Sequence, residues 1–101
     1  MVIISRPHIE AFIRKNPLSA NSLNNWYFKT KNANWSNLNE AKLINPACDY
    51  IGNDRYVFNI GGNNYRLVAM IHFSNRTLYI RAILTHPEYD EFSSKGLLEK
   101  I

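Results

Sequence analysis

Four side chains in the second half of the chain are of the types that could break a phosphodiester bond: Arg66, Arg81, His86 and Tyr89. Cleaving RNA without a metal requires a base for the 2′-hydroxyl proton, cations for the charge that develops on phosphorus, and an acid for the leaving 5′-oxygen. Guanidinium groups bind phosphate through paired hydrogen bonds and stay charged, and imidazole exchanges protons near neutral pH. The four residues therefore make a candidate catalytic set, in which Tyr89 serves as acid or base if the arginines lower its pKa.

The charge around these residues is one-sided. Residues 55–87 contain four arginines and two histidines but no aspartate or glutamate. Such a stretch favours an anionic ligand, and we expect further RNA contacts from four other basic residues, which are Arg55, His72, Arg76 and Lys42. A single arginine or histidine on a strand is more often a solvated or packing residue. A purely structural role therefore stays open for each position taken alone.

Three runs of alternating residues predict the strands that carry this site. Successive strand residues point to opposite faces of a sheet, so each run has an apolar face and a second face. The predicted apolar face consists of Tyr56, Phe58, Ile60, Leu67, Ala69, Ile71, Phe73, Leu78, Ile80, Ala82 and Leu84. The second face carries Arg, His and Tyr side chains together with Val57, Val68 and Ile83, and we expect it to stay open while helices cover the first. Turns rich in Gly, Asn and Ser at 61–64 and 74–76 connect the runs as an antiparallel meander.

The rest of the chain supplies the helices. Residues 1–4 predict a short edge strand, and apolar stripes predict one helix that Asn16-Pro17 ends and a second over residues 19–31. Residues 36–44 predict a further helical turn or two. Thr85 and Glu88 have the spacing of a capping box, which starts a last short helix and puts His86 at its first position, where free N–H groups favour an anion. The predicted fold class is α+β, with two N-terminal helices packed on one face of a small antiparallel sheet and a short C-terminal helix.

Length and composition narrow the class of protein. The 101 residues predict a single domain, and twelve Lys and Arg against eight Asp and Glu give a formal charge of +4, which favours an anionic partner. The single cysteine, Cys48, allows neither an internal disulfide nor a cysteine-based zinc site. We expect a cytoplasmic protein without a membrane association, because no signal peptide and no membrane-spanning stretch is recognisable. We also expect no metal and no cofactor, because the acids Glu88, Asp90 and Glu91 are neighbours in one segment and no phosphate-binding glycine loop is present.

Four motifs follow one another in a characteristic order: Trp35, DYIGNDR at 49–55, VFNIGGNNYRL at 57–67 and THPEYD at 85–90. In this combination they resemble the HigB-type toxins of bacterial toxin–antitoxin pairs, which belong to the RelE-like ribonuclease superfamily. The resemblance covers about residues 35–92. The N-terminal third is similar only in its pattern of a short strand followed by two helices.

The resemblance implies a ribosome-dependent mRNA endonuclease, or mRNA interferase, that stops translation until a cognate antitoxin covers it. Cleavage would need no metal, with arginines stabilising the transition state and a Tyr, His or Lys handling protons. The implied partners are mRNA, the ribosome and a separately encoded antitoxin with a helix-turn-helix domain, similar to HigA. The family's functional positions match Arg66, Arg81, His86 and Tyr89, and Arg55 is an additional match.

The sequence departs from the family pattern at the hairpin, and other functions stay open. Members of the family often carry lysines where this chain has Gly61 and Asn64, so Arg55, Lys42 or Arg76 would contact RNA in their place. The chain could also be a non-catalytic module that blocks translation by binding RNA or the ribosome, or a protein that binds its antitoxin and tunes repression of their operon. A nuclease should keep RNA binding and lose cleavage on His86→Ala, whereas a binding module should tolerate that change.

Overall fold

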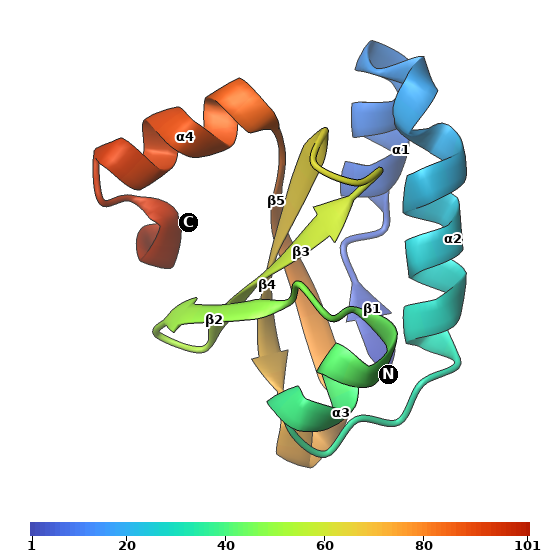
Figure 1. The fold of residues 1–101 in the computed structure, drawn as a ribbon. Coiled ribbons are helices and arrows are strands. Elements are labelled where there is room, and N and C mark those ends of the chain that lie inside the picture. The colour runs from blue at the N-terminus through green and yellow to red at the C-terminus, as the bar shows by residue number, and fades with distance from the viewer.

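The computed structural model describes residues 1–101, which form one five-stranded sheet with helices on both of its sides (Figure 1). The strands are β1 (Val2–Ile4), β2 (Asp49–Gly52), β3 (Arg55–Ile60), β4 (Tyr65–His72) and β5 (Thr77–Thr85), in the spatial order β1-β5-β4-β3-β2. The helices are α1 (Pro7–Lys15), α2 (Ala20–Lys31), α3 (Leu38–Ile44) and α4 (His86–Ser94), with 3₁₀ turns at Pro17–Ser19, Phe73–Asn75 and Leu98–Lys100. The α+β class, the N-terminal helix pair and the meander of β3, β4 and β5 are confirmed.

The edges of the sheet differ from the predicted arrangement. β1 is an edge strand, as predicted, but it runs parallel to β5, so the sheet is mixed rather than wholly antiparallel. β2 adds a strand at the opposite edge, antiparallel to β3, where the sequence analysis predicted no strand. The pairing of β2 with β3 is irregular between Tyr50 and Gly52.

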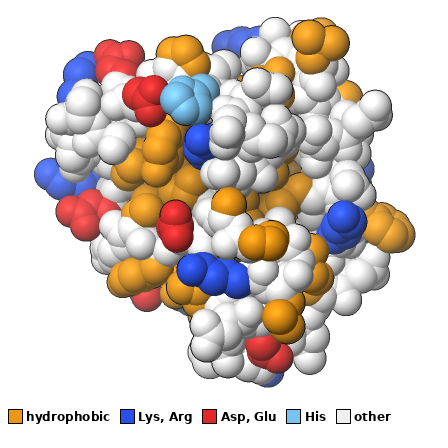
Figure 2. Space-filling view, in the orientation of Figure 1, with side chains coloured by type: hydrophobic (Ala, Val, Ile, Leu, Met, Phe, Trp, Pro, Cys, Tyr) orange, Lys and Arg blue, Asp and Glu red, His pale blue; other side chains and the backbone are white.

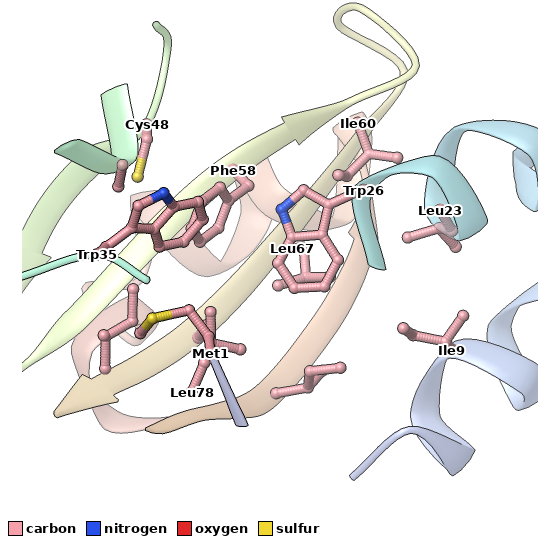
Figure 3. Packing of buried hydrophobic residues seen from close by; sticks show 14 residues of the cluster. Met1, Ile9, Leu23, Trp26, Trp35, Cys48, Phe58, Ile60, Leu67 and Leu78 are labelled. Carbon is pink, nitrogen blue, oxygen red and sulfur yellow. The ribbon is translucent and has the colours of Figure 1, made fainter. Parts of the chain in front are cut away.

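The hydrophobic core lies between the sheet and the helices α1 and α2. Phe58 is fully buried at its centre, with the ring of Trp26 at 5.3 Å between centroids and the ring of Trp35 stacked at 6.0 Å (Figure 3). Cys48 is also fully buried in this cluster. Because burial penalises the charged thiolate, the pKa of Cys48 rises to about 12. Trp26 of α2 and Trp35 of the following loop therefore pack in the core, whereas Phe28 of α2 is exposed.

A bulge in β5 changes which of its side chains face the core. Val68 pairs with Ala82, whereas the next residue, Ala69, pairs with Ile80, so Arg81 is an extra residue in β5. An extra residue shifts the alternation by one, and everything after it changes face. The prediction for the end of this strand was therefore wrong. Ile83 pairs with Leu67 and packs against the core, and Leu84 pairs with Arg66 on the second face.

The second face of the sheet is not open throughout. Val57, Val68 and Leu84 are buried on it. The helix α4 contacts β4 and β5 and lies across the sheet from α1 and α2, and the turn Leu98–Lys100 contacts β2 (Figure 1). The expectation of an open second face holds only for its margins, because α4 and the residues after it cover the apolar centre.

Local hydrogen bonds fix the start of α4. Both bonds of the predicted capping box are present, since the Thr85 hydroxyl accepts from the backbone N–H of Glu88 and the Glu88 carboxylate accepts from the N–H of Thr85. The backbone N–H of His86 donates to the carbonyl oxygen of Asn64 in the β3–β4 hairpin. The first turn of α4 is therefore tied both to itself and to the hairpin. Among the helices, none is long and apolar enough to cross a membrane.

Candidate active site

Arg66 and Tyr89 come together where β4 begins and α4 passes over the sheet. The guanidinium carbon of Arg66 lies 5.5 Å from the centre of the Tyr89 ring, and its Nη1 donates to the carbonyl oxygen of Tyr65 at 3.1 Å. Both side chains are half-buried. The contact brings a permanent cation and a phenol from two separate elements to one place, as the sequence analysis proposed for these two residues.

His86 stands on the same helix and is held by a carboxylate. Its Nδ1 lies 3.1 Å from Oδ2 of Asp90, one helical turn further on, and both side chains are exposed. The carboxylate is thus within ion-pair distance of Nδ1, and the other ring nitrogen, Nε2, remains available to accept a proton.

Asp90 is the residue that the sequence analysis missed. There it was considered only with its acidic neighbours, as an argument against a metal site. The sequence already indicated the contact between His86 and Asp90, because a histidine and an aspartate four positions apart on a predicted helix lie on one face and can form a hydrogen bond. The structure contains no group of three or more His, Cys, Asp or Glu side chains placed to hold a metal ion.

The environment of Tyr89 raises its pKa above the ordinary value for tyrosine. Desolvation by burial is the largest cause, and the neighbouring charges of Asp49 and Asp90 act in the same direction, while Arg66 opposes them. The sequence analysis let Tyr89 serve as acid or base if the arginines lowered its pKa. That condition is not met, because loss of water around the phenol outweighs the single nearby cation. Tyr89 keeps its proton at neutral pH, which suits a proton donor and not a base.

Arg81 does not contact this group and instead shares a hydrogen-bond acceptor with Arg55. The Nε of Arg55 on β3 and the Nε of Arg81 on β5 both donate to the backbone oxygen of Ile101, the last residue of the sequence, at 3.1 and 3.2 Å. No hydrogen bond or ion pair joins Arg81 to Arg66, His86 or Tyr89. The candidate catalytic set is therefore divided. Arg66, His86 and Tyr89 lie on β4 and α4, whereas Arg81 shares its hydrogen-bond acceptor with Arg55, which the sequence analysis predicted only as an RNA contact.

Side chains on the second face link this arginine pair to the edge of the sheet. Arg55 pairs with Met70, Met70 with Tyr79, and Tyr79 with Ile4, so one row crosses four strands. His72 packs edge-on against the Tyr79 ring at 5.7 Å between centroids. His72 is thus placed beside Tyr79, an aromatic residue that the sequence analysis did not select.

Figure 2 shows apolar side chains exposed in a hollow on the α4 side, with charged side chains and a histidine at its rim.

The other two candidates lie away from both groups. Arg76 follows the 3₁₀ turn between β4 and β5, at the end of the sheet opposite to α4, and donates to Asn34 Oδ1 at 2.8 Å and Ser36 Oγ at 3.1 Å. Lys42 is in the last turn of α3, which lies toward the same end (Figure 1). These contacts give Arg76 a role in holding the loop before α3, and the structure brings neither residue to the candidate site.

Comparison with known proteins gives the family. The model for HigB toxins, described as the RelE-like toxic component of a toxin–antitoxin system, matches residues 19–92. This chain belongs to the HigB toxin family. The resemblance seen in the sequence motifs is confirmed, and the match extends it through α2 toward the N-terminus.

Individual HigB proteins show the same relationship. The chain is 35% identical over 95 residues to the mRNA interferase HigB of Escherichia coli O6:H1 (strain CFT073), with 92% of each chain covered. It is 45% identical over 56 residues to the mRNA interferase toxin HigB of Escherichia coli (strain K12), which covers 52% of this chain and 53% of that protein. The mRNA interferase HigB of Shigella flexneri gives the same 45% identity over 56 residues.

One departure from the HigB pattern has a structural reason. Gly61 has a φ of +60°, and Gly62 beside it has +67°, so the hairpin turn runs through the left-handed region. A lysine at position 61 would be strained there, since a side chain disfavours that backbone conformation. In this chain the positive charge near the hairpin therefore comes from Arg66 alone among the residues next to the turn.

Proposed function

We propose that this HigB-family chain is an mRNA endonuclease that cuts messages on the ribosome without a metal ion. The observation that carries the proposal is the grouping of His86, held at Nδ1 by Asp90, with Arg66 over the ring of Tyr89. These three side chains supply the base, the cation and the acid that cleavage at a 2′-hydroxyl needs. The printed names of the HigB relatives, mRNA interferases, agree with this chemistry.

In the proposed reaction, His86 Nε2 takes the proton from the 2′-hydroxyl, and the 2′-oxygen attacks the adjacent phosphorus. The guanidinium of Arg66 neutralises the charge that develops on the phosphate oxygens. Tyr89 gives its proton to the 5′-oxygen as the P–O5′ bond breaks, which leaves a 2′,3′-cyclic phosphate and a 5′-hydroxyl. The raised pKa of Tyr89 suits this role, because the phenol is protonated before the reaction.

The proposal includes partners. The catalytic groups are exposed or half-buried on an open surface, so they need a larger body to hold the RNA in a reactive geometry. A programmed ribosome in the cytoplasm would do this. A separately encoded antitoxin with a HigA-like helix-turn-helix domain would silence the toxin by covering the α4 side of the sheet, where Arg66, His86 and Tyr89 lie.

The test is cleavage of a defined message on programmed ribosomes, mapped by primer extension, with wild type and His86→Ala. We expect wild type to cut the message and His86→Ala to leave it intact while still binding ribosomes. Glu91→Gln is the matched control, since Glu91 is an exposed residue of the same helix that pairs with Lys95 outside the site. Translation arrest by wild type with an intact message would contradict the proposal and would establish a ribosome-blocking module instead.

A further inference from the structure

A pocket of about 260 Å³, which we call the α2–hairpin pocket, lies between helix α2, the end of α3 and the hairpin that joins β3 to β4. Its α2 side is a single stripe of the helix, positions 22, 25, 26 and 29, because side chains three and four positions apart share a face. Ile44 and Asn45 close the pocket at the end of α3, and residues 59–62 close it at the hairpin. Three separate elements thus converge on one hollow.

Hydrogen-bond donors without an acceptor belong to the residues that line this pocket. The indole nitrogen of Trp26 and the amide nitrogen of Asn45 are both buried and bond to nothing within the chain. Only 5% of Trp26 is exposed, and Figure 3 shows the nitrogen edge of its ring turned toward β3, the strand whose end closes the pocket. A buried donor that lacks an acceptor is costly to the folded state, so a ligand that brings an oxygen to this place is favoured.

The charge of the pocket selects a singly charged anion. Lys29 is exposed, takes part in no ion pair, and is the only charged residue that lines the pocket. One ammonium group balances the single charge of a carboxylate, whereas a phosphate group carries close to two charges at neutral pH. Ser22 and Asn25 add polar groups at the same wall, and Ile44 and Ile60 provide an apolar surface. A carboxylate with a short apolar body satisfies both kinds of lining.

We propose that the α2–hairpin pocket binds a small monocarboxylate with a short apolar body. The carboxylate accepts from Trp26 Nε1 and Asn45 Nδ2 and lies near the ammonium of Lys29. The apolar body lies against Ile44 and Ile60. The inference goes beyond the proposed function and does not rest on it, because no part of it involves RNA.

The α2–hairpin pocket lies across the sheet from the candidate active site. The helices α2 and α4 cover opposite faces, and the pocket contains none of Arg66, His86 and Tyr89 (Figure 1). The hairpin connects the two places, since residues 61 and 62 line the pocket and the carbonyl oxygen of Asn64 accepts from the backbone N–H of His86 at 3.1 Å. A ligand in the pocket therefore contacts the turn that holds the first residue of α4 and leaves the α4 side of the sheet free.

The experiment follows the two indole N–H signals of isotope-labelled protein by NMR while sodium isovalerate is added at physiological ionic strength. Trp35 is the internal control, because its indole nitrogen is also buried without a partner but the residue does not line the pocket. Trp26→Phe assigns the signals, and Trp35→Phe does so if that variant fails to fold. We expect the Trp26 signal to shift and saturate while the Trp35 signal stays in place. Isovaleramide, the neutral isostere, should bind about fivefold more weakly, the size of a surface charge pair, and inorganic phosphate should also bind more weakly.

Paired substitutions on α2 test which face receives the ligand. Asn25→Asp keeps the shape of the side chain and brings a negative charge to the pocket, whereas Asn24→Asp makes the same change at a neighbouring exposed asparagine that does not line it. We expect Asn25→Asp and Lys29→Gln each to raise the dissociation constant for isovalerate about fivefold. Asn24→Asp should leave it within about twofold, because salt screens a charge that makes no contact. All three residues are exposed, so the circular dichroism spectra should match that of wild type.

Several results would overturn the inference. These are a Trp26 signal that does not shift saturably, equal shifts of the Trp26 and Trp35 signals, equal affinity for isovalerate and isovaleramide, and an effect of Asn24→Asp as large as that of Asn25→Asp. Tighter binding of inorganic phosphate than of isovalerate would also overturn it, because the pocket would then select a different anion. The titration contains no RNA, so messages left intact on ribosomes would refute the nuclease and leave this inference in place.

Discussion

Replacing Asp90 by asparagine tests how His86 is held. The change removes the negative charge 3.1 Å from Nδ1 and allows the amide to present a donor there, which disfavours the imidazole tautomer with its proton on Nδ1. Both side chains are largely in water, with 46% of His86 and 63% of Asp90 exposed, so the orienting bond is in the range of a surface pair. That range is at most about 1 kcal/mol, which corresponds to a loss of about fivefold in the rate of cleavage.

The assay is single-turnover cleavage of a message on programmed ribosomes with the toxin in excess, and Glu91→Gln on the same helix is the control. We expect the melting temperature of Asp90→Asn to stay close to that of wild type, because an exposed pair contributes little to stability. A rate equal to wild type would refute the reasoning, since Asp90 would then have no part in orienting His86. A loss above about a hundredfold would refute it from the other side, because a carboxylate that only orients an exposed ring cannot account for it.

Three further changes test other parts of the structure. Tyr89→Phe removes the proposed acid and should slow cleavage by about a hundredfold without weakening RNA binding. Because the pKa of Tyr89 is raised, the phenol of wild type stays protonated through the neutral range. A pH–rate profile should therefore show that the contribution of Tyr89 to the cleavage rate is lost only on the alkaline side. Arg66→Gln should relieve growth arrest on overexpression with an unchanged circular dichroism spectrum, and an unfolded variant would make Arg66 a structural residue instead. Phe58→Ala removes the fully buried ring between Trp26 and Trp35. A denaturant titration should show a free energy of unfolding lowered by about 3–5 kcal/mol, and a loss below about 1 kcal/mol would mean that the core collapses around the gap.

Local patterns in the sequence were sufficient for most of the fold. The alternation in β3 and β4, the Gly-Gly turn between them and the Thr85–Glu88 capping box all appear as predicted, because each depends on residues close in the chain. The parallel pairing of β1 depends on contacts with β5, more than seventy positions away, and no local pattern records it. The bulge at Arg81 left no mark either, since neither glycine nor proline stands there and the alternation of residue types continues through it.

The candidate site was predicted in its residue types and only partly in its geometry. Arg66 and Tyr89 meet, and His86 stands on the same helix, because α4 starts at the capping box and lies over β4. The sequence analysis placed Arg81 with them, whereas in the structure Arg81 is the extra residue of a bulge and donates to Ile101, as Arg55 does. The contact of both arginines with Ile101 was beyond prediction, because strand alternation contains no information on where a segment after the last helix returns.

The buried thiol of Cys48 makes the protein its own reporter of unfolding. It is the only sulfhydryl in the chain and is fully enclosed, so an alkylating reagent can reach it only when α3 and β2 separate from the core or when the whole domain opens. The rate of its modification under native conditions therefore measures the population of that open state, with no label introduced. An antitoxin that binds only the folded toxin should slow the alkylation of Cys48 in proportion to the fraction of toxin bound. Complex formation can then be followed without RNA, ribosomes or growth assays.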